Sequence, residues 1–312
     1  MNPLYKVFFT LLFFHSAYST EDFSHNLNQV SPSEIKRYFI LGERCSGTNY
    51  VFSLVQKNFP SLSPTSDYGH KHFLLWFGAP ENEEMMQKLQ YSSKHYDLSE
   101  SEDCLFIFVV RDPYKWLRSF YSTPHHVHPD LLGNSFLHFI SHTWKFSETR
   151  LPNHEAFGLI DGQNPFTHRP FKNVCELRSY KIRNSLLLGS RVNHFVIAPY
   201  EKVRKDPQGF IKYIASNYHL NPSKEFAPID SYKGLEEEQY KAKKYSSIKR
   251  SSLTYINQNL DWELENSLGY SKRQIEKKSR IYLFFRQVEC TCRKFIKSLF
   301  KEDQTLAKNS EP

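Results

Sequence analysis

Residues 37–58 read RYFILGERCSGTNYVFSLVQKN, in which an apolar run, a turn bounded by glycines and a helical pattern follow one another. Residues 38–41 have the length and apolarity of a buried strand, and residues 48–58 have the character of a helix. Gly42 and Gly47 bound the turn between them. Where a strand, a tight turn and a helix meet, backbone N–H groups and the helix N-terminus converge and can bind an anion. The stretch therefore predicts an α/β domain with an anion-binding loop at residues 42–48.

The two glycines have the spacing of a nucleotide-triphosphate P-loop, but two residues of that motif differ. Thr48 stands where the motif has lysine, and Asn49 stands where it has the Mg²⁺-binding Ser or Thr. These differences weaken an interpretation as a kinase or an ATPase. Taken alone, the loop is equally compatible with a tight turn that needs glycine only for its backbone conformation.

Further apolar runs extend the strand pattern along the chain. Residues 104–110 (CLFIFVV) show no polar alternation, which predicts a strand buried on both faces of a parallel sheet, and residues 194–198 (HFVIA) predict another strand. Helical patterns lie at residues 114–121, 136–146, 172–188 and 207–218. The alternation predicts a three-layer α/β domain of the P-loop type, with a central parallel sheet flanked by helices. Residues 130–170, rich in Pro, Asn, Gly and His, are interpreted as an inserted cap or substrate loop.

A second candidate anion site follows the strand at residues 104–110. Arg111 stands at the carboxyl end of that strand, and Ser119 is expected two turns into the next helix. Open α/β sheets bind ligands outside the carboxyl ends of their strands, where an arginine and a hydroxyl can hold a phosphate. Asp112 is predicted to be a helix N-cap and not a magnesium ligand, because Pro113 follows it.

Taken together, these segments resemble the P-loop sulfotransferase superfamily, whose donor is 3′-phosphoadenosine 5′-phosphosulfate (PAPS). The Ser46-Gly47-Thr48 loop looks like its 5′-phosphosulfate loop, and Arg111 to Tyr121 looks like its 3′-phosphate motif. Residues 199–207 are similar to a Tyr-Glu…Asp-Pro segment of the family, and residues 256–270 resemble the end of its domain. The matches occur in the family's order, which suggests a domain at residues 37–270.

The resemblance implies transfer of a sulfuryl group from PAPS to a hydroxyl or amine acceptor that the sequence does not identify, with no metal. The residues implied to bind the donor are Arg44, Cys45, Ser46, Gly47, Thr48, Asn49, Arg111 and Ser119. Many family members carry lysine where this chain has Cys45. Arg44 and Lys71 are the two candidates to replace its charge. A catalytically impaired nucleotide-binding protein, and less favourably a P-loop kinase, are the alternatives.

The expected general base is His72 in the segment YGHKHF, residues 68–73. It precedes the strand that leads to Arg111, as the family's catalytic histidine does, and histidine is the commonest general base in enzymes. His70 is the second candidate. The alternative is that either ring packs in the fold or faces solvent.

Two further groups of charged or titratable residues could belong to a site or to a solvated surface. His125, His126 and His128 lie in a loop flanked by prolines, which favours a solvated or substrate-facing loop over a metal site. Arg178, Lys181 and Arg183 fall on a predicted helix. A solvated face is the simpler interpretation, and contact with the nucleotide or an anionic acceptor is the alternative.

The composition of the 312 residues, with 39% hydrophobic and 16% aromatic residues, excludes a disordered chain. The five cysteines are odd in number and show no CxxC spacing, so neither a disulfide framework nor a zinc site is favoured. Residues 1–20 contain VFFTLLFF after Lys6 and the small-residue pattern Ala17-Tyr18-Ser19. This layout is typical of a secretory signal or an anchor, and a cytoplasmic protein is the alternative.

The chain carries a formal charge of +8, and most of this excess lies at its C-terminal end. Residues 271–312 hold eleven Lys or Arg against five acids, so the preceding body is nearly neutral. This distribution argues against a broad nucleic-acid surface. Apolar residues at intervals of three and four over residues 281–300 predict a basic amphipathic helix, which lies on an anionic membrane or docks on the protein's own core.

Overall fold

The computed structural model describes residues 25–27, 34–72, 74, 76, 98–147, 162–164, 166–232, 235–239 and 243–275. Residues 1–272 form one compact unit and residues 273–312 form another. The features described below all belong to the first unit. The signal-like segment at residues 1–20 and the amphipathic helix expected at residues 281–300 lie outside the described residues.

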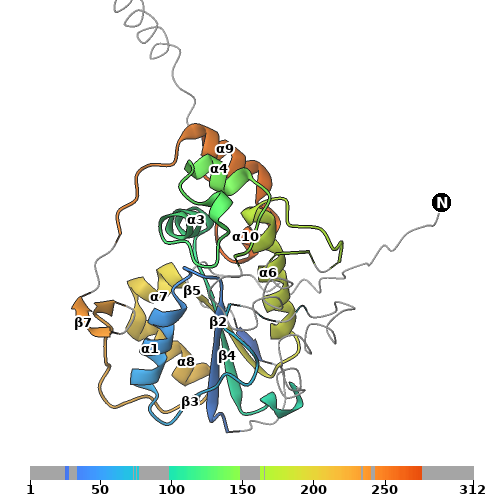
Figure 1. The fold of residues 1–312 in the computed structure, drawn as a ribbon. Coiled ribbons are helices and arrows are strands. Elements are labelled where there is room, and N and C mark those ends of the chain that lie inside the picture. The colour runs from blue at the N-terminus through green and yellow to red at the C-terminus, as the bar shows by residue number, and fades with distance from the viewer. Residues whose placement is uncertain are drawn as a thin grey trace, which may run out of the picture. The chain divides into compact units, whose positions relative to one another are not determined.

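A five-stranded sheet in the order β1-β5-β4-β2-β3 forms the centre of the unit (Figure 1). Its strands are β1 (His25–Leu27), β2 (Arg37–Gly42), β3 (Ser63–Pro64), β4 (Cys104–Val110) and β5 (His194–Pro199). Strands β5, β4, β2 and β3 run parallel, and β1 pairs with β5 in the antiparallel direction. The register sets Gly42 opposite Val109 and Val109 opposite Ala198. The carboxyl ends of the three central strands therefore meet at one edge of the sheet.

The helices are α1 (Thr48–Asn58), α3 (Pro113–Ser122), α4 (Phe136–Ser141), α6 (Val174–Gly189), α7 (Tyr200–Lys205), α8 (Pro207–Asn217), α9 (Arg250–Asn259) and α10 (Trp262–Ser267). Two short 3₁₀ helices, η2 (Leu98–Ser101) and η3 (Pro129–Leu131), and the hairpin β6 (Ser231–Tyr232) and β7 (Leu235–Gln239) complete the described elements.

Successive side chains of the central strands point to opposite faces of the sheet, as the pleat requires. Ile40 and Ile107 pack with α1 and α8 on one face, whereas Phe39 and Phe106 pack with α6 on the other. Figure 1 shows α1 and α8 on one side of the strands and α6 on the other. The sequence prediction of an α/β fold with a parallel sheet flanked by helices is confirmed.

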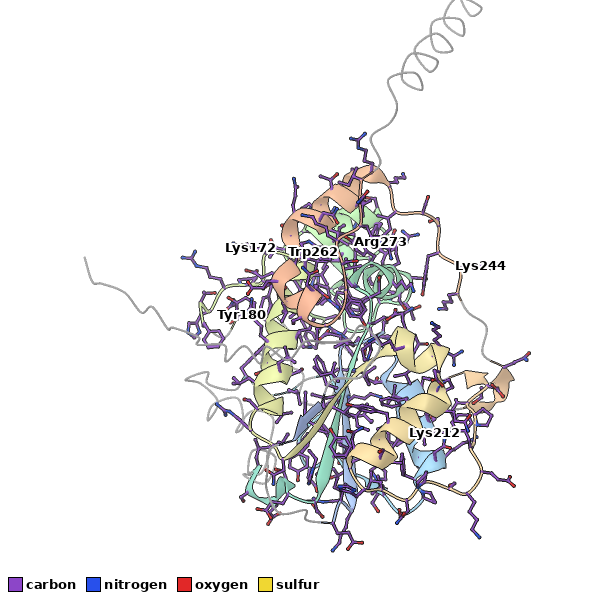
Figure 2. The ribbon with its side chains drawn as sticks, turned by 180° about the vertical axis from the view of Figure 1, so that it is seen from behind. Lys172, Tyr180, Lys212, Lys244, Trp262 and Arg273 are labelled. Carbon is purple, nitrogen blue, oxygen red and sulfur yellow. The ribbon has the colours of Figure 1, made fainter. Side chains whose placement is uncertain are left out.

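A third apolar cluster lies around α3, α4 and α9 and is built largely from aromatic side chains, including Trp116, Phe120, Phe139 and Trp144. Trp262, labelled in Figure 2, stacks on Tyr114 with a distance of 5.7 Å between ring centroids and so ties α10 to α3. This cluster supports the helix that carries Ser119.

The helix predicted at residues 136–146 ends at Ser141, so that prediction is wrong in its second half. His142 already has extended backbone, with φ −80° and ψ 156°. Trp144 then donates its backbone N–H to the carbonyl of Phe171 at 2.9 Å. The aromatic spacing that suggested a longer helix arises because Trp144 packs on Phe120 and Phe139 from an extended segment.

Candidate functional site

The loop at residues 42–48 is closely packed and needs its two glycines. Gly47 has φ +101°, and a Cβ atom there would lie 2.2 Å from the ring of Tyr200. Gly42 has φ +152°, and a Cβ atom there would lie 2.4 Å from the carbonyl oxygen of Val109. L side chains rarely adopt such φ values, so glycine is required at both positions.

The loop leads directly into α1, whose N-terminal turn is suited to an anion. The N-cap is Gly47, whose position supplies no side-chain cap, and the first turn holds no acidic residue. The N–H groups of this turn and the helix dipole together favour a negative ligand. Ser46 adds a hydroxyl that is buried and has no hydrogen-bond partner among the described residues. The prediction of an anion-binding turn therefore has a matching geometry.

Arg111 lies beside this loop, at the end of β4. Its Nη1 donates to the carbonyl oxygen of Cys45 at 2.7 Å, and its guanidinium lies 5.2 Å from the ring centroid of Tyr200. Its buried Nε has no hydrogen-bond partner within the part of the chain described. The structure thus brings the two sequence motifs together, because Tyr200 packs against both Gly47 and Arg111.

The helix after Arg111 begins as the sequence predicted. Asp112 is the N-cap of α3 and accepts a hydrogen bond from the backbone N–H of Lys115 at 2.8 Å. Ser119 is partly exposed on that helix and lies close to Cys45. Burial raises the pKa of the Cys45 thiol, although the charges of Arg44 and Arg111 and a hydrogen bond with Ser119 act in the opposite direction. The thiol is therefore protonated at neutral pH.

The side chain of Arg44 is buried against aromatic rings of the neighbouring cluster. Its guanidinium lies 4.9 Å from the ring centroid of Phe120 and 5.6 Å from that of Trp144, and the residue is 1% exposed. Its Nη1 donates to the carbonyl oxygen of His125 at 3.3 Å. In this conformation the guanidinium of Arg44 makes cation–π contacts with the aromatic cluster.

Lys71, in the segment at residues 70–72, contacts both the loop and the first turn of α1. Its Nζ donates to Oδ1 of Asn49, in the first turn of α1, at 2.6 Å. Its carbonyl oxygen accepts the N–H of Gly42 at 2.9 Å. Lys71 therefore holds the segment against the loop and places an ammonium group at the N-terminal turn of α1.

His72 faces the loop with a defined tautomer. Its Nδ1 lies 2.6 Å from the carbonyl oxygen of Gly42, and because a carbonyl can only accept, Nδ1 carries the hydrogen. The Nε2 atom consequently has a lone pair. Burial lowers the pKa of His72 well below its usual value, with the hydrogen bond to Gly42 acting in the opposite direction. The ring is neutral at pH 7 and can accept a proton at Nε2.

His70 stands beside His72, with 5.4 Å between their ring centroids. Burial, together with the positive charges of Lys71 and Lys181, lowers the pKa of His70 to about 4. The two rings are therefore a pair of neutral imidazoles in a positively charged surrounding.

A small pocket adjoins His72 and includes two charged residues, Glu43 and Lys181, that the sequence analysis did not assign to the site. Its lining consists of Gly42, Glu43, Lys71, His72, Leu74, Trp76, Lys181, Asn184 and Ser185. Lys181 on α6 lies 3.2 Å from Oε1 of Glu43 and donates to the carbonyl oxygen of His72 at 2.6 Å. Both residues are more than nine-tenths buried.

The interpretation of Arg178, Lys181 and Arg183 as a solvated face is wrong for the first two. Arg178 is 1% exposed and bonds through its Nε to Oε1 of Glu265 at 2.6 Å, while its Nη2 donates to the carbonyl oxygen of Arg111. Only the Arg183 side chain is exposed, beside Asp261. The signal in the sequence was that Arg178, Lys181 and Ser185 recur at intervals of three and four, which places them on one side of the helix.

His125, His126 and His128 lie in the loop after α3, where His128 accepts a hydrogen bond from the backbone N–H of Asp130. Within the described ranges, no group of three His, Cys, Asp or Glu side chains is arranged to hold a metal ion. Among the described helices, none has the length and apolarity needed to cross a bilayer. Comparison of the sequence with models of protein families and with curated proteins found no match to either.

Proposed function

We propose that this protein is a PAPS-dependent sulfotransferase with a three-layer domain of the P-loop type. The observation that carries the proposal is the convergence of three groups at one edge of the sheet. These are the N-terminal turn of α1, Arg111 at the end of β4, and a neutral His72 whose Nε2 has a lone pair. A twice-phosphorylated donor needs two anion sites, and transfer to a hydroxyl needs a base beside them.

The residues divide between the two ends of the donor. The N–H groups at residues 47–49, the hydroxyl of Ser46 and the dipole of α1 suit the 5′-phosphosulfate. Arg111 and the hydroxyl of Ser119 suit the 3′-phosphate, since arginine forms charge-assisted hydrogen bonds with phosphate oxygens. PAPS, when bound, supplies an activated sulfuryl group on a phosphate leaving group.

His72 and Lys71 then have distinct roles in the transfer. Nε2 of His72 accepts the proton of the acceptor hydroxyl while that oxygen forms its bond to sulfur. The ammonium of Lys71, held at the first turn of α1 by Asn49, stabilises the charge that the leaving phosphate oxygen acquires. The orientation of Arg44 into the aromatic cluster favours Lys71 over Arg44 for this role.

Two measurements test the proposal in sequence. Calorimetry of the full chain with adenosine 3′,5′-bisphosphate should show one binding site, whose affinity falls when Arg111 is replaced by alanine. Transfer of labelled sulfate from PAPS to a panel of carbohydrate, lipid and tyrosine-peptide acceptors should then identify the acceptor class. Absence of nucleotide binding would overturn the donor assignment.

A nucleotide-binding protein without transfer activity is the second candidate, favoured by Cys45. A neutral thiol stands where lysine is expected, and burial keeps it protonated. This candidate predicts nucleotide binding without transfer to any acceptor in the panel. A P-loop kinase predicts instead that ATP with Mg²⁺ displaces the bisphosphate.

A further inference from the structure

Lys181 is the point at which the loop and the histidine segment are joined to α6. Its Nζ lies 3.2 Å from Oε1 of Glu43, the second residue of the loop, and donates to the carbonyl oxygen of His72 at 2.6 Å. The preceding loop residue, Gly42, accepts the hydrogen bond from Nδ1 of His72. One buried ammonium therefore contacts His72 itself and Glu43, the residue that follows the acceptor of the bond that sets the tautomer of His72.

Anchoring of α6 to the fold does not account for this arrangement, because α6 has a separate anchor. Arg178, one turn earlier on the helix, is paired with Glu265 and bonds to the carbonyl oxygen of Arg111. Arg178 thus joins α6 to α10 and to the end of β4, whereas Lys181 joins it to the loop and to the histidine segment. A buried ion pair generally gives little net stability, but it can fix one arrangement of the groups around it.

We propose that Lys181, with Glu43 as its counterion, is a positioning residue that acts through His72. The inference rests on the proposed function and adds a residue from outside both sequence motifs. By holding the carbonyl of His72, Lys181 fixes the backbone from which the ring projects, so Nδ1 stays on Gly42 and the Nε2 lone pair keeps one direction. A misplacement of about 1 Å in such a group can lower a reaction rate about a hundredfold.

The test uses three variants of the full chain. Lys181→Met combined with Glu43→Gln removes both buried charges together, so that neither is left unpaired. Lys181→Arg keeps the charge and the donors. Arg183→Met is the matched control, because it removes a cation from the same helix at an exposed position beside Asp261.

The main readout is the ¹⁵N spectrum of the His72 ring, which distinguishes the two neutral tautomers and needs no acceptor. We expect the Nδ1–H form alone in the native chain and in Arg183→Met, and a mixture of both tautomers in the double variant. The single variant Lys181→Arg should keep the native signal at least in part. Transfer should fall by about tenfold to a hundredfold in the double variant, while the affinity for adenosine 3′,5′-bisphosphate changes less than about threefold.

An unchanged His72 tautomer in a folded double variant would overturn the inference. If the double variant does not fold, Lys181→Arg decides by itself: a native spectrum with altered turnover contradicts a role through His72, and a partly mixed spectrum supports it. Failure of the native chain to bind the bisphosphate overturns the proposed function instead, and the two failures are separate because the spectrum is recorded without nucleotide.

Discussion

The loop at residues 42–48 and the histidine segment at residues 70–72 lie against each other, but they are held there in different ways. The loop is continuous with β2 on one side and α1 on the other, so its local sequence sets much of its path, and contacts from Lys181 and Arg111 add to this. The histidine segment is held by contacts to residues distant in the chain, namely Gly42, Asn49 and Lys181. Ligand affinity should therefore depend mainly on the loop, and the chemical step on the segment.

The largest effect should come from breaking the loop itself. Gly47→Ala puts a Cβ atom 2.2 Å from the ring of Tyr200 at φ +101°, so both strain and overpacking destabilise it. We expect a loss of about 2 to 5 kcal/mol in the free energy of unfolding, and no detectable binding of the bisphosphate. Gly133→Ala is the matched control. Its φ is +72° and a Cβ there has open space, so it should cost about 1 kcal/mol and leave binding unchanged. Chemical denaturation and calorimetry measure both quantities.

Replacing the general base in the histidine segment should lower turnover without lowering the affinity for the bisphosphate, which depends on the loop. His72→Ala is expected to lower turnover by about a hundredfold or more, because Nε2 no longer accepts the acceptor proton. The bisphosphate affinity should stay within about threefold of native, since the donor contacts are elsewhere. Steady-state kinetics on the acceptor found in the panel measures turnover, with His128→Ala as the control. A fully active His72→Ala protein would transfer the role to His70.

Changes at the residues assigned to the 3′-phosphate should lower the affinity for the bisphosphate. Arg111→Ala removes charge-assisted hydrogen bonds to a phosphate, each worth about 1.5–3 kcal/mol, so the affinity should fall by about tenfold to a hundredfold. Ser119→Ala should act in the same direction with a smaller effect. Lys115→Ala, an exposed change on the same helix, serves as the control in calorimetry. Unchanged affinity in both variants contradicts the assignment of the 3′-phosphate to this place.

The smallest predicted effect is a pH dependence of the free energy of unfolding, which arises from His70 in the histidine segment. Burial lowers the pKa of His70 from 6.5 to about 4, so between these values the unfolded chain binds a proton that the folded chain does not. The free energy of unfolding should therefore decrease as the pH falls from about 6.5 to about 4. Urea unfolding at pH 7 and pH 5 measures this loss, which His70→Gln should reduce and His128→Gln should not. An identical loss in all three proteins would place the pH dependence elsewhere.

The sequence predicted the sheet and the loop because their signals are local. The strands at residues 37–42 and 104–110 are short apolar runs, and the helix at residues 48–58 starts directly after the second glycine of the turn. Arg111 could be placed at the same edge because the carboxyl ends of parallel strands align. The helix at residues 136–141 was predicted too long because aromatic spacing does not distinguish a helix from a segment packed on one.

The charged pair of Glu43 and Lys181 could not be predicted in the same way. The two residues are far apart in the chain, and the burial of Lys181 depends on how α6 packs against the histidine segment. The side-chain direction of Arg44 has the same origin, because the aromatic cluster that surrounds it is assembled from α3 and the segment after α4. Both outcomes are set by tertiary packing. Charge patterns along the sequence carry little information about that packing.

Strand β1 covers one edge of the parallel strands, the outer side of β5. The three residues from His25 to Leu27 run antiparallel along β5 and cover the backbone groups on the outer side of that strand. An uncovered edge of this kind is a template for pairing with another chain. A protein shortened to begin at Glu34 would present that edge, and such a truncation is expected to self-associate even though it removes nothing from the candidate site.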